Sequence, residues 1–563
     1  MAKKDYTDLT KEELIELVNK LEGKKKYGLV WDEEKTPEKV VLDCQKKLPI
    51  LTSVKKNDIS TDETEPTHIL IEGDNFHSLS VLNYTHSGQI DFIYADPPYN
   101  TGARDWKYNN NYVDNTDNFR HSKWLSFMKN RLTLAKSLLA DDGIICVTID
   151  DYEMPRLWLL MEEIFGPDNY LGTAAIRINP GGRKSKRKLA AQHEYALFFS
   201  VSNDTKVSKI YVAPESKSHS YKKDENGDWY EERNLRKEGQ DSIAKPGAKR
   251  YFPIYRNSDT GQISSKIKFN QEILPIDTKG QKRIWRRAEE DIDALADKGD
   301  IFYKKTKYGH QLYFKFKGGL KGETPKSFWE DAKYSASEHG TAILDEVLGE
   351  SDLFPFPKSL YAVEDCIRVG THKKDAKILD FFAGSGTTGQ AVLNLNKEDN
   401  GSREFILCTN NENKIAEEVT LQRVNNIIKG YKDVQGLGSN LRYFKTGFIA
   451  NTKNKDQLRL NITKKCTEML CLKEGIYNLF KENEDWKIFK YGNKYLAVYY
   501  DFASISLEGL KDEMNKLEGE KVLYCFTVNP YGLEIENFDD WENIRLEPIP
   551  QKILDVYKRI FKK

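Results

Sequence analysis

A carboxylate and an aromatic ring occupy a rigid corner at the end of a predicted strand. Residues 91–100 read DFIYADPPYN, an apolar strand that ends at Asp96, Pro97, Pro98 and Tyr99. Neither proline can donate a ladder hydrogen bond, so the strand stops there on a stiff backbone. The Asp96 carboxylate and the Pro97 carbonyl can accept the protons of an exocyclic amine, and the Tyr99 ring offers a face for a stacked base. We expect this corner to be catalytic, although a turn that only ends a strand is the simpler interpretation of a four-residue motif.

A glycine-rich turn forms the second candidate site. Residues 380–389 read DFFAGSGTTG between an apolar strand and a helix, and Gly384 and Gly386 allow a ligand to approach the backbone closely. A phosphate-binding loop needs a lysine at this point, but two threonines follow Gly386, and the third glycine is misplaced for a dinucleotide fingerprint. An unliganded strand–helix turn is one alternative. The ligand that fits is a nucleoside without phosphates that carries an amino acid, such as S-adenosylmethionine.

Both sites belong to a β/α alternation that is interrupted in the middle of the chain. Alternating βαβ units predict a parallel sheet. We expect the α/β class, with a Rossmann-like doubly wound sheet assembled from two chain segments, an inserted α+β domain and an α+β C-terminal domain. The expected parts are an N-terminal helix with a charged, loop-rich linker (1–65), the first sheet segment with a polar loop at 101–120 (66–200), the insert (201–335), the second sheet segment (336–449) and the C-terminal domain (450–563).

The insert and the residues just before it are rich in basic and aromatic side chains. Lysine and arginine neutralise phosphates, and arginine also reads base edges in the major groove. A solvated surface is the simpler interpretation of any single lysine in such a segment. We predict a target-recognition domain for duplex DNA, with Arg250 and Arg286 ranked first among its contacts. The predicted DNA-binding residues are Arg183, Lys184, Lys186, Arg250, Arg256, Arg283 and Arg286.

Composition excludes several other classes of protein. The 563 residues include 87 basic and 87 acidic side chains, so net charge points to no particular partner. No apolar run is long enough to cross a bilayer, and the N-terminus has no signal-peptide segment. Seven cysteines lack zinc-type spacing, nine histidines form no HExxH motif, and no helicase, ATPase or nuclease motif is visible. We expect a cytoplasmic protein without a metal site or membrane partner.

Several stretches together resemble a known family. They include LIEGDNFHSLSVL, IDFIYADPPYNTG, HEYALFFS, FPFPKSLYAVEDCI and ILDFFAGSGTTGQAV, spread over residues 68–430. The sequence resembles the DNA amino-methyltransferases of the permuted β order, in which the catalytic motif precedes the cofactor loop. More narrowly, it is similar to the modification (Mod) subunits of type III restriction–modification systems of bacteria.

The resemblance implies a role for individual residues. Asp96, Pro97, Pro98 and Tyr99 match the catalytic motif, which acts on a base flipped out of the duplex. An initial aspartate in that motif implies adenine N6 rather than cytosine N4 as the methylated atom. For the cofactor S-adenosylmethionine, the resemblance implies contacts from Asp380, Phe382, Gly384 and Gly386, from Lys358 and Ser359, from Asp74 at the adenine, and from Asn410 or Glu412 at the ribose.

The resemblance also implies an assembly and leaves alternative substrates open. Type III Mod subunits form homodimers and bind a motor–nuclease (Res) subunit. The aromatic tail segment WKIFKYGNKYLAVYYD has the strand character expected of a docking segment. The alternatives are an amino-methyltransferase that acts on cytosine N4, on RNA or on a protein glutamine amide, and a specificity module without catalysis that guides a partner nuclease.

Overall fold

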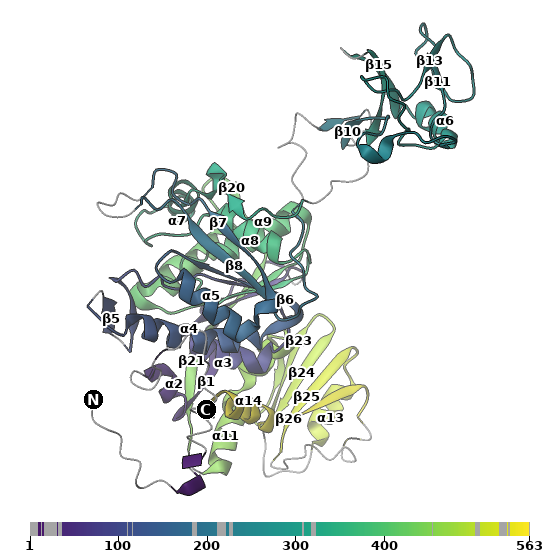
Figure 1. Ribbon diagram of the computed structural model, residues 1–563. Coiled ribbons are helices and arrows are strands. Elements are labelled where there is room, and N and C mark those ends of the chain that lie inside the picture. Colours follow the sequence, from purple (N-terminus) through teal and green to yellow (C-terminus); the bar gives the residue numbers. More distant parts are fainter. Residues whose placement is uncertain are drawn as a thin grey trace. The chain divides into compact units, whose positions relative to one another are not determined.

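The computed structural model contains two compact units, shown in Figure 1. Unit 1 combines Met1–Ser208 with Pro325–Lys563, and unit 2 is Lys209–Thr324. Unit 2 lies inside the predicted insert (201–335), whose outermost residues on both sides therefore belong to unit 1. The structure describes residues 10–12, 14–15, 31, 37–62, 64–109, 111–114, 116–182, 189–210, 221–224, 229–306, 309–316, 323–452, 454–500, 507–527, 538 and 541–561.

A ten-stranded sheet forms the centre of unit 1 in the part of the chain that the structure describes. Six neighbouring strands, from β21 to β6 in space, are parallel, whereas β1 and β8 run antiparallel to their neighbours. This arrangement confirms the α/β class and the assembly from two chain segments. In spatial order the strands are β1 (Lys47–Ser53), β21 (Asn440–Ala450), β2 (Thr67–Glu72), β18 (Glu404–Thr409), β17 (Lys377–Asp380), β3 (Ile90–Ala95), β6 (Leu139–Ile149), β8 (Glu194–Ser200), β7 (Tyr170–Ile176) and β16 (Phe328–Trp329).

Helices cover both faces of this sheet, which explains why its parallel strands are apolar nearly throughout. Ile93 and Ala95 of β3 lie in the same core as α3, α4 and α5, while Phe92, the residue before Ile93, packs closely under Gly370 of α8 on the other face. Figure 1 shows α3, α4 and α5 on the viewer's side. The helices are α3 (Asn75–Thr85), α4 (Arg120–Lys136) and α5 (Met154–Phe165) on one face, and α7 (Ala342–Leu348), α8 (Leu360–Gly370), α9 (Thr387–Asp399) and α10 (Leu421–Lys429) on the other.

The site is positioned where two adjacent strands lead the chain in opposite directions. β17 and β3 are parallel neighbours, with Asp380 opposite Tyr94. From β17 the chain continues to β18 on one side, and from β3 it continues to β6 on the other side. Ligands of open α/β sheets bind in the crevice that such a reversal of strand order leaves at the carboxyl ends. The glycine-rich turn at residues 380–389, called the Gly loop below, and the turn at residues 96–99, called the Asp96 corner, both start at this edge.

Three local predictions differ from the structure. The linker predicted as loop contains α2 (Lys39–Asp43) and the sheet strand β1, and the polar loop at 101–120 contains the hairpin β4 (Ala103–Tyr108) and β5 (Asn111–Asp114). β1 includes Pro49, which argues against a strand unless the strand lies at an edge, and β1 is such an edge strand. Strand β21 was not predicted. The predicted N-terminal helix lies largely outside the described residues.

The C-terminal segment has a sheet of its own but shares a core with the rest of unit 1. Side chains of α12 and α14 pack in one cluster with α3 and β1, and the Tyr557 hydroxyl donates a hydrogen bond to the Pro49 carbonyl. The segment predicted to dock forms β23 and β24, which are interior strands paired on both sides. The elements are α11 (Lys455–Lys465), α12 (Thr467–Glu474), β22 (Asn478–Glu482), β23 (Trp486–Tyr491), β24 (Lys494–Tyr499), α13 (Glu508–Asn515), β25 (Glu520–Phe526), β26 (Ile544–Ile549) and α14 (Gln551–Phe561), and the short β19 (Gly430–Tyr431) and β20 (Val434–Gln435) pair between α10 and β21.

Unit 2 is a small α+β domain with a separate core. Leu235, Phe252, Trp285 and Ile292 are buried in this core, and the Trp285 indole donates a hydrogen bond to the Phe252 carbonyl at 2.9 Å. One sheet has the order β14-β15-β10-β9 and the other the order β12-β11-β13. The elements are β9 (Tyr221–Lys223), β10 (Trp229–Asn234), β11 (Ile254–Arg256), β12 (Ile263–Ser264), β13 (Gln271–Ile273), α6 (Glu289–Asp297), β14 (Ile301–Thr306) and β15 (Gly309–Phe316).

Candidate active site

The Asp96 corner is fixed by hydrogen bonds from two neighbouring elements. The Thr148 hydroxyl on β6 donates to Asp96 Oδ1 at 2.7 Å, and the Trp124 indole on α4 donates to the Pro98 carbonyl at 2.7 Å. The Asp96 side chain is one-quarter exposed (25%), although the strand that leads to it is buried. The structure therefore presents a carboxylate in a fixed orientation at the open end of β3.

Lys358 and Glu194 lie directly against this corner. Lys358 Nζ is 3.1 Å from Asp96 Oδ1 and 2.5 Å from Glu194 Oε2, and it also contacts the Tyr99 hydroxyl. The Tyr99 hydroxyl donates to Glu194 Oε2 at 2.8 Å. Burial, reinforced by the charges of Asp96 and Glu194, holds the pKa of Tyr99 well above its usual range. Lys358, predicted at the cofactor, thus contacts the predicted catalytic residues.

The Gly loop begins at a buried aspartate. Asp380 Oδ1 accepts a hydrogen bond from the Phe382 backbone N–H at 2.9 Å, and Oδ2 accepts one from the Thr388 hydroxyl at 2.6 Å. Burial raises the pKa of Asp380 to about 7, against the two hydrogen bonds that lower it. Asp380 therefore braces both ends of the turn and titrates near neutral pH.

Two positions in this loop need glycine. Gly384 has φ 48° and Gly386 has φ 77°, in the left-handed region that favours glycine. A Cβ on Gly386 would lie 3.1 Å from Thr420 Cγ2, and a Cβ on Gly384 would lie 3.0 Å from Phe354 Cζ. The Thr420 hydroxyl also donates to the Gly384 carbonyl at 2.6 Å. The loop can pass close to its neighbours only because these side chains are absent.

A buried arginine supports the loop from beneath. Arg423 on α10 is fully buried, and its guanidinium donates to Gln390 Oε1 at 2.8 Å and to Thr387 Oγ1 at 2.8 Å. Burial lowers the pKa of Arg423 to about 9. Because Thr387 and Gln390 lie in the first turn of α9, Arg423 fixes the start of the helix that follows the loop.

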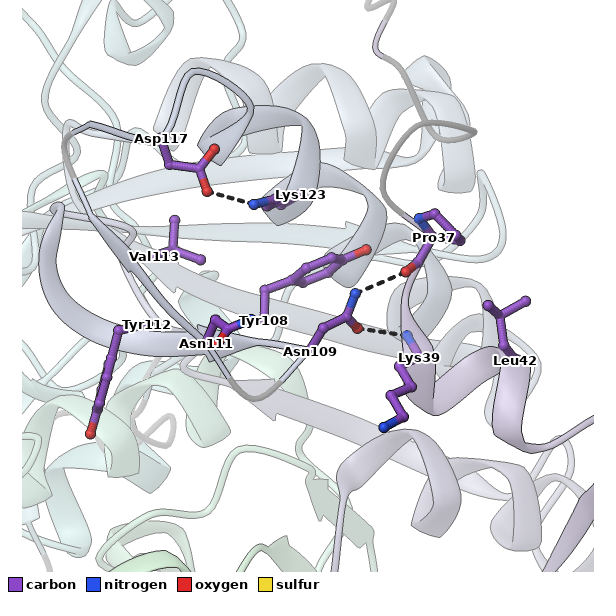
Figure 2. Close-up of a pocket in the computed structure, with 10 residues that line it drawn as sticks. All are labelled: Pro37, Lys39, Leu42, Tyr108, Asn109, Asn111, Tyr112, Val113, Asp117 and Lys123. Atoms are coloured by element: carbon purple, nitrogen blue, oxygen red, sulfur yellow. Dashed lines mark hydrogen bonds and ion pairs between the residues drawn. The ribbon is translucent and has the colours of Figure 1, made fainter.

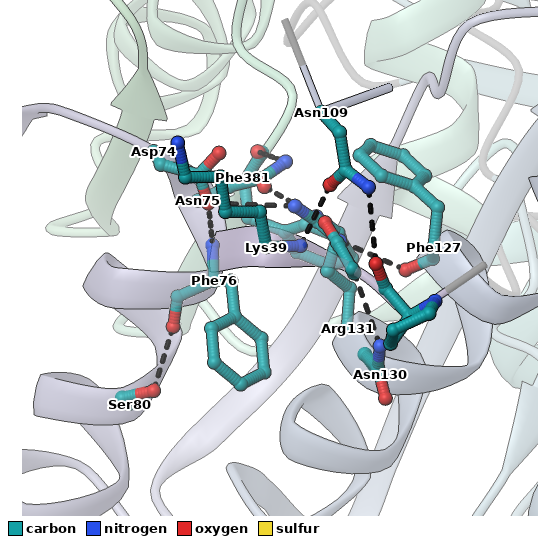
Figure 3. A network of polar contacts seen from close by, with 12 residues as sticks. Lys39, Asp74, Asn75, Phe76, Ser80, Asn109, Phe127, Asn130, Arg131 and Phe381 are labelled. Atoms are coloured by element: carbon teal, nitrogen blue, oxygen red, sulfur yellow. Dashed lines mark hydrogen bonds and ion pairs between the residues drawn. The ribbon is translucent and has the colours of Figure 1, made fainter. Parts of the chain in front are cut away.

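Asp74, predicted at the cofactor's adenine, belongs to a second polar network (Figure 3). Asp74 caps α3, with Oδ1 accepting from the Phe76 N–H at 2.8 Å. Buried Arg131 on α4 donates to Asn75 Oδ1 at 2.5 Å and pairs with Glu38 at 2.8 Å. Asn75 in turn donates to the Phe381 carbonyl at 3.0 Å. This network joins the start of α3 to the strand end at the Gly loop.

Asn410, Glu412 and Ser359 have intramolecular partners. Asn410 and Glu412 follow β18 and are exposed; Asn410 Oδ1 accepts from the Glu412 N–H at 3.2 Å, and Lys107 Nζ lies 3.1 Å from Glu412 Oε2. The buried Ser359 hydroxyl donates to the Lys333 carbonyl at 2.9 Å. β18 is the neighbour of β17, so Asn410 and Glu412 lie one strand away from the Gly loop. Their contacts with the cofactor stay predictions.

A cavity of about 510 Å³ lies beside the β4–β5 hairpin that follows the corner (Figure 2). Tyr108, Asn109 and Tyr112 of the hairpin line it together with Lys39 of α2. The Asn109 side chain accepts from the Lys39 N–H at 2.6 Å and donates to the Pro37 carbonyl at 3.0 Å. Its described lining includes none of the residues predicted for catalysis or cofactor binding, so this cavity is distinct from the candidate active site.

In unit 2, the predicted DNA-reading arginines fall into two groups. Arg283 donates to Asp277 and to the Gly239 carbonyl, and Arg256 donates to Gln271 and lies over the Tyr303 ring. Arg250 and Arg286 are exposed, and Arg286 also donates to the Asn234 carbonyl at 3.0 Å. Arg183, Lys184 and Lys186 lie outside the described residues. DNA contacts of all seven residues stay predictions.

Sequence reasoning missed Thr148, Glu194, Arg131 and Arg423 as parts of the site. Arg131 had a signal in the sequence, because it falls at helical spacing with the buried residues Met128 and Ala135. Glu194 opens an apolar strand, and an acid at such a position is exposed more often than buried. Its role follows only from the chain segment that carries Lys358.

Neither a metal site nor a membrane span emerges from the described residues. They contain no group of three or more His, Cys, Asp or Glu that could hold a metal ion. None of their helices is both long and apolar enough to cross a membrane.

Comparisons with known proteins identify the family of the chain. A family model described as DNA methylase, the N6/N4 methylase family, matches residues 90–420, more than half of the chain. The type II methyltransferase M.KpnI of Klebsiella pneumoniae is 33% identical over 381 residues, which cover 64% of this chain and 88% of that protein. The EcoPI Mod subunit of a type III restriction–modification enzyme, from Escherichia phage P1, is 29% identical over 440 residues, which cover 71% of this chain and 66% of that subunit.

A solved structure is also similar to this chain. The PvuII DNA methyltransferase, described as cytosine-N4-specific, is 13% identical, and the match covers 67% of this chain and 97% of that one with a TM-score of 0.34. The glycine-requiring loop, the buried Asp380 and the absence of a lysine in the turn suit a cofactor without phosphates. The chain belongs to the N6/N4 DNA methylase family, and it is a DNA methyltransferase with S-adenosylmethionine as its cofactor.

Proposed function

We propose that this enzyme methylates N6 of an adenine that has been flipped out of duplex DNA. The observation that carries the proposal is the placement of the Asp96 carboxylate beside the Gly loop, at the shared edge of β3 and β17. The choice of adenine over cytosine rests on the aspartate that opens the catalytic motif in place of a serine. Duplex DNA as substrate agrees with the family of the chain.

The chain's own residues activate the amine. S-adenosylmethionine supplies an electrophilic methyl group on a sulfonium. Asp96 accepts an N–H of the amine, which frees the nitrogen lone pair from the ring. With the cofactor bound, the amine nitrogen would take the methyl group while sulfur keeps the electron pair of the broken S–C bond, and Asp96 would pass the proton that the nitrogen loses to solvent. Lys358 Nζ contacts the Tyr99 hydroxyl and lies 4.6 Å from the ring centroid, so it holds the hydroxyl end of the ring and leaves the ring face to the stacked base.

The cofactor is held at the ends of three neighbouring strands. Gly384, Gly386 and Phe382 would contact it along the loop after β17, with Asp380 at its methionine portion. Asp74, after β2, would contact the adenine, and Glu412, after β18, would bind the ribose hydroxyls after exchanging its ion pair with Lys107. Glu412 is the better ribose ligand of the two candidates because its carboxylate has two acceptor oxygens for two hydroxyls, whereas the single acceptor oxygen of Asn410 already accepts a hydrogen bond from the Glu412 backbone.

One experiment tests both the reaction and the base. Purified protein is incubated with labelled S-adenosylmethionine and plasmid DNA, and the nucleosides are separated after digestion. We expect label in N6-methyladenine. Label in N4-methylcytosine would show that the target base is cytosine and not adenine. Label in an RNA competitor but not in DNA would show that the substrate is RNA.

Arg250 and Arg286 are the base-reading candidates that the structure favours. Arg286→Ala should lose about 1–3 kcal/mol of affinity, as expected for one arginine–guanine contact, and only for DNA that contains the recognition sequence. Arg283→Ala is the matched control, because the Arg283 guanidinium donates hydrogen bonds to Asp277, the Gly239 carbonyl and Ser242. Its loss should destabilise unit 2 without changing site preference. Site preference is measured by sequencing the methylated positions in a random-sequence library. Unchanged preference in every arginine variant of unit 2 would remove its role in recognition.

We further propose that the enzyme is the Mod subunit of a type III system, a homodimer that binds a Res subunit. The similarity to the EcoPI Mod subunit supports this assignment. A second candidate is a methyltransferase that acts without a motor–nuclease partner, which the 33% identity to the type II enzyme M.KpnI favours. Light scattering at micromolar concentration tests the dimer. Mass spectrometry of proteins that co-purify with the tagged chain from its own host tests for a partner with helicase and nuclease motifs.

A further inference from the structure

Three distant segments of the chain bring their charges together at the catalytic corner. Asp96 follows β3, Glu194 opens β8, and Lys358 precedes α8. Lys358 Nζ is 2.5 Å from Glu194 Oε2 and 3.1 Å from Asp96 Oδ1. The exposed fractions of the Glu194 and Lys358 side chains are 2% and 15%, so these charges interact more strongly than they would in water.

The contacts distinguish the two oxygens of Asp96. Thr148 Oγ1 at 2.7 Å and Lys358 Nζ at 3.1 Å both meet Oδ1. A carboxylate oxygen with two donors is well satisfied, whereas the second oxygen keeps its lone pairs for another donor. We therefore assign Oδ2 to the substrate amine.

The charge of the cluster also suits the reaction. Two carboxylates and one ammonium leave a single negative charge beside a nitrogen that becomes positive during methyl transfer. The ammonium lies closer to Glu194 than to Asp96, so Asp96 is oriented by Lys358 without being fully neutralised by it. We propose that Glu194 and Lys358 are a positioning pair, which holds Asp96 in place and turns Oδ2 toward the amine. This inference rests on the proposed function and adds two residues to it.

Several titratable groups face Asp96 or Glu194 from the surrounding elements. Burial raises the pKa values of Tyr94, Tyr99 and Cys366 well above their usual ranges, so these groups stay neutral in the working range. Asp380, whose pKa is about 7, also feels the charge of Asp96. Asp380 is present in every variant below, so differences in pH dependence between the variants report on the Glu194–Lys358 pair. The groups are Lys358, Glu194, Tyr94, Tyr99, Asp380 and Cys366.

Two single substitutions should shift the pH dependence in opposite directions. Lys358→Met leaves two adjacent carboxylates without their cation, so one of them takes up a proton at higher pH. On the low-pH side of the profile, the single-turnover rate falls as a carboxylate takes up a proton; we call this part of the profile the acid limb. In Lys358→Met, the midpoint of the acid limb should move to a pH about one unit higher, and the rate should fall roughly tenfold or more. Glu194→Gln leaves the ammonium to Asp96 alone, so the acid limb should move downward while the plateau rate falls severalfold.

The measurement is single-turnover methylation of plasmid DNA between pH 5 and 9, beside cofactor affinity by calorimetry. S-adenosylmethionine affinity should stay within about twofold in both variants, which separates the pair from the Gly loop. Lys358→Arg should restore part of the rate. The double variant should show a smaller limb shift than Lys358→Met, because the second carboxylate that caused the shift is gone.

Glu364→Gln is the matched control. Glu364 is a buried carboxylate on α8 whose side chain accepts a hydrogen bond from Asn394 at 2.9 Å, and it does not belong to the cluster. We expect its pH profile to match the wild type. If the wild type methylates DNA but both variants keep its acid limb, or shift it in the same direction, the pair does not position Asp96. A wild-type protein that methylates no DNA instead refutes the proposed function, and the pair with it.

Discussion

Asp96 and Asp380 end neighbouring parallel strands of one sheet, and the structure holds their carboxylates in contrasting ways. Asp96 is partly exposed, and one of its oxygens contacts Thr148 and Lys358. Asp380 is buried, and each of its oxygens accepts a hydrogen bond from its own loop, from Phe382 or from Thr388. A cation therefore orients the first carboxylate, whereas neutral donors satisfy the second.

The contrast shows how one sheet edge supports two different tasks. A carboxylate that a neighbouring ammonium orients, and that has an open oxygen, can receive a donor from the substrate. A carboxylate enclosed in its own loop loses hydration, and burial brings the pKa of Asp380 to about 7. Asp96 is therefore expected to act on the amine, and Asp380 to shape the cofactor loop and to titrate. Four substitutions test this division, from the largest expected effect to the smallest.

Replacing Asp96 should abolish most of the chemistry and spare the cofactor. Asp96→Ala removes the acceptor that activates the amine, so single-turnover methylation should fall roughly 100- to 1,000-fold or more. The Gly loop is untouched, and S-adenosylmethionine should still bind in calorimetry. Methylation at the wild-type rate would show that the corner is only a turn.

Replacing Gly386 should have the reverse effect. Gly386→Ala places a Cβ 3.1 Å from Thr420 Cγ2 at φ 77°, so we expect a roughly tenfold or greater loss of S-adenosylmethionine affinity, with much of the rate recovered at saturating cofactor. Gly349→Ala is the matched control, since Gly349 has φ 74° but open space around the added Cβ. Equal loss of affinity in the two variants would mean that backbone strain alone, and not the shape of the loop, lowers binding.

Replacing Asp380 should remove a pH dependence. Asp380 has a pKa of about 7, so it is largely protonated at pH 6 and ionised at pH 8, and the ionised form should attract the cationic cofactor. Wild-type affinity should therefore rise severalfold from pH 6 to pH 8, whereas Asp380→Asn should show a flat profile by calorimetry. The same slope in both proteins would assign the titration to another group.

The titration of Asp380 should make the folded protein less stable as the pH rises, whereas it should make cofactor affinity stronger. Because burial raises the folded-state pKa from its usual value of 3.8 to about 7, the folded state holds a proton that the unfolded state has lost. This contribution is complete below about pH 4 and disappears as the pH rises to about 7. The melting temperature of the wild type should therefore fall more between pH 5 and pH 7.5 than the melting temperature of Asp380→Asn, which has no carboxyl at this position.

Removing the Thr148 hydroxyl should give the smallest effect. Thr148→Val keeps the buried volume but deletes one of the two donors to Asp96 Oδ1, while Lys358 still holds that oxygen. We expect a rate loss of only a few fold, with unchanged cofactor affinity, measured in the same single-turnover assay. A loss as large as that of Asp96→Ala would mean that Thr148 and not Lys358 orients the carboxylate.

Local patterns were sufficient to predict the strands that lead to the two motifs, and the motifs themselves. The apolar runs before Asp96 and Asp380 are long and continuous because a parallel sheet is buried on both faces. Pro97, Pro98, Gly384 and Gly386 restrict the backbone through their own covalent structure, so their effect can be read without knowledge of their neighbours. β1 was missed because its edge position, which makes Pro49 acceptable, depends on β21 about 400 residues later.

The sequence by itself therefore determined the α/β class, the Asp96 corner and the glycine loop, since each depends on residues that are adjacent in the chain. Only the tertiary structure decided which side chains surround these motifs. Glu194 and Lys358 are 164 positions apart, and nothing in either local sequence indicates that they meet at Asp96. Their contact depends on the return of the chain to the same sheet edge after unit 2. Ion pairs of this kind are set by the packing of distant segments, whereas strand ends and tight turns are set by backbone geometry.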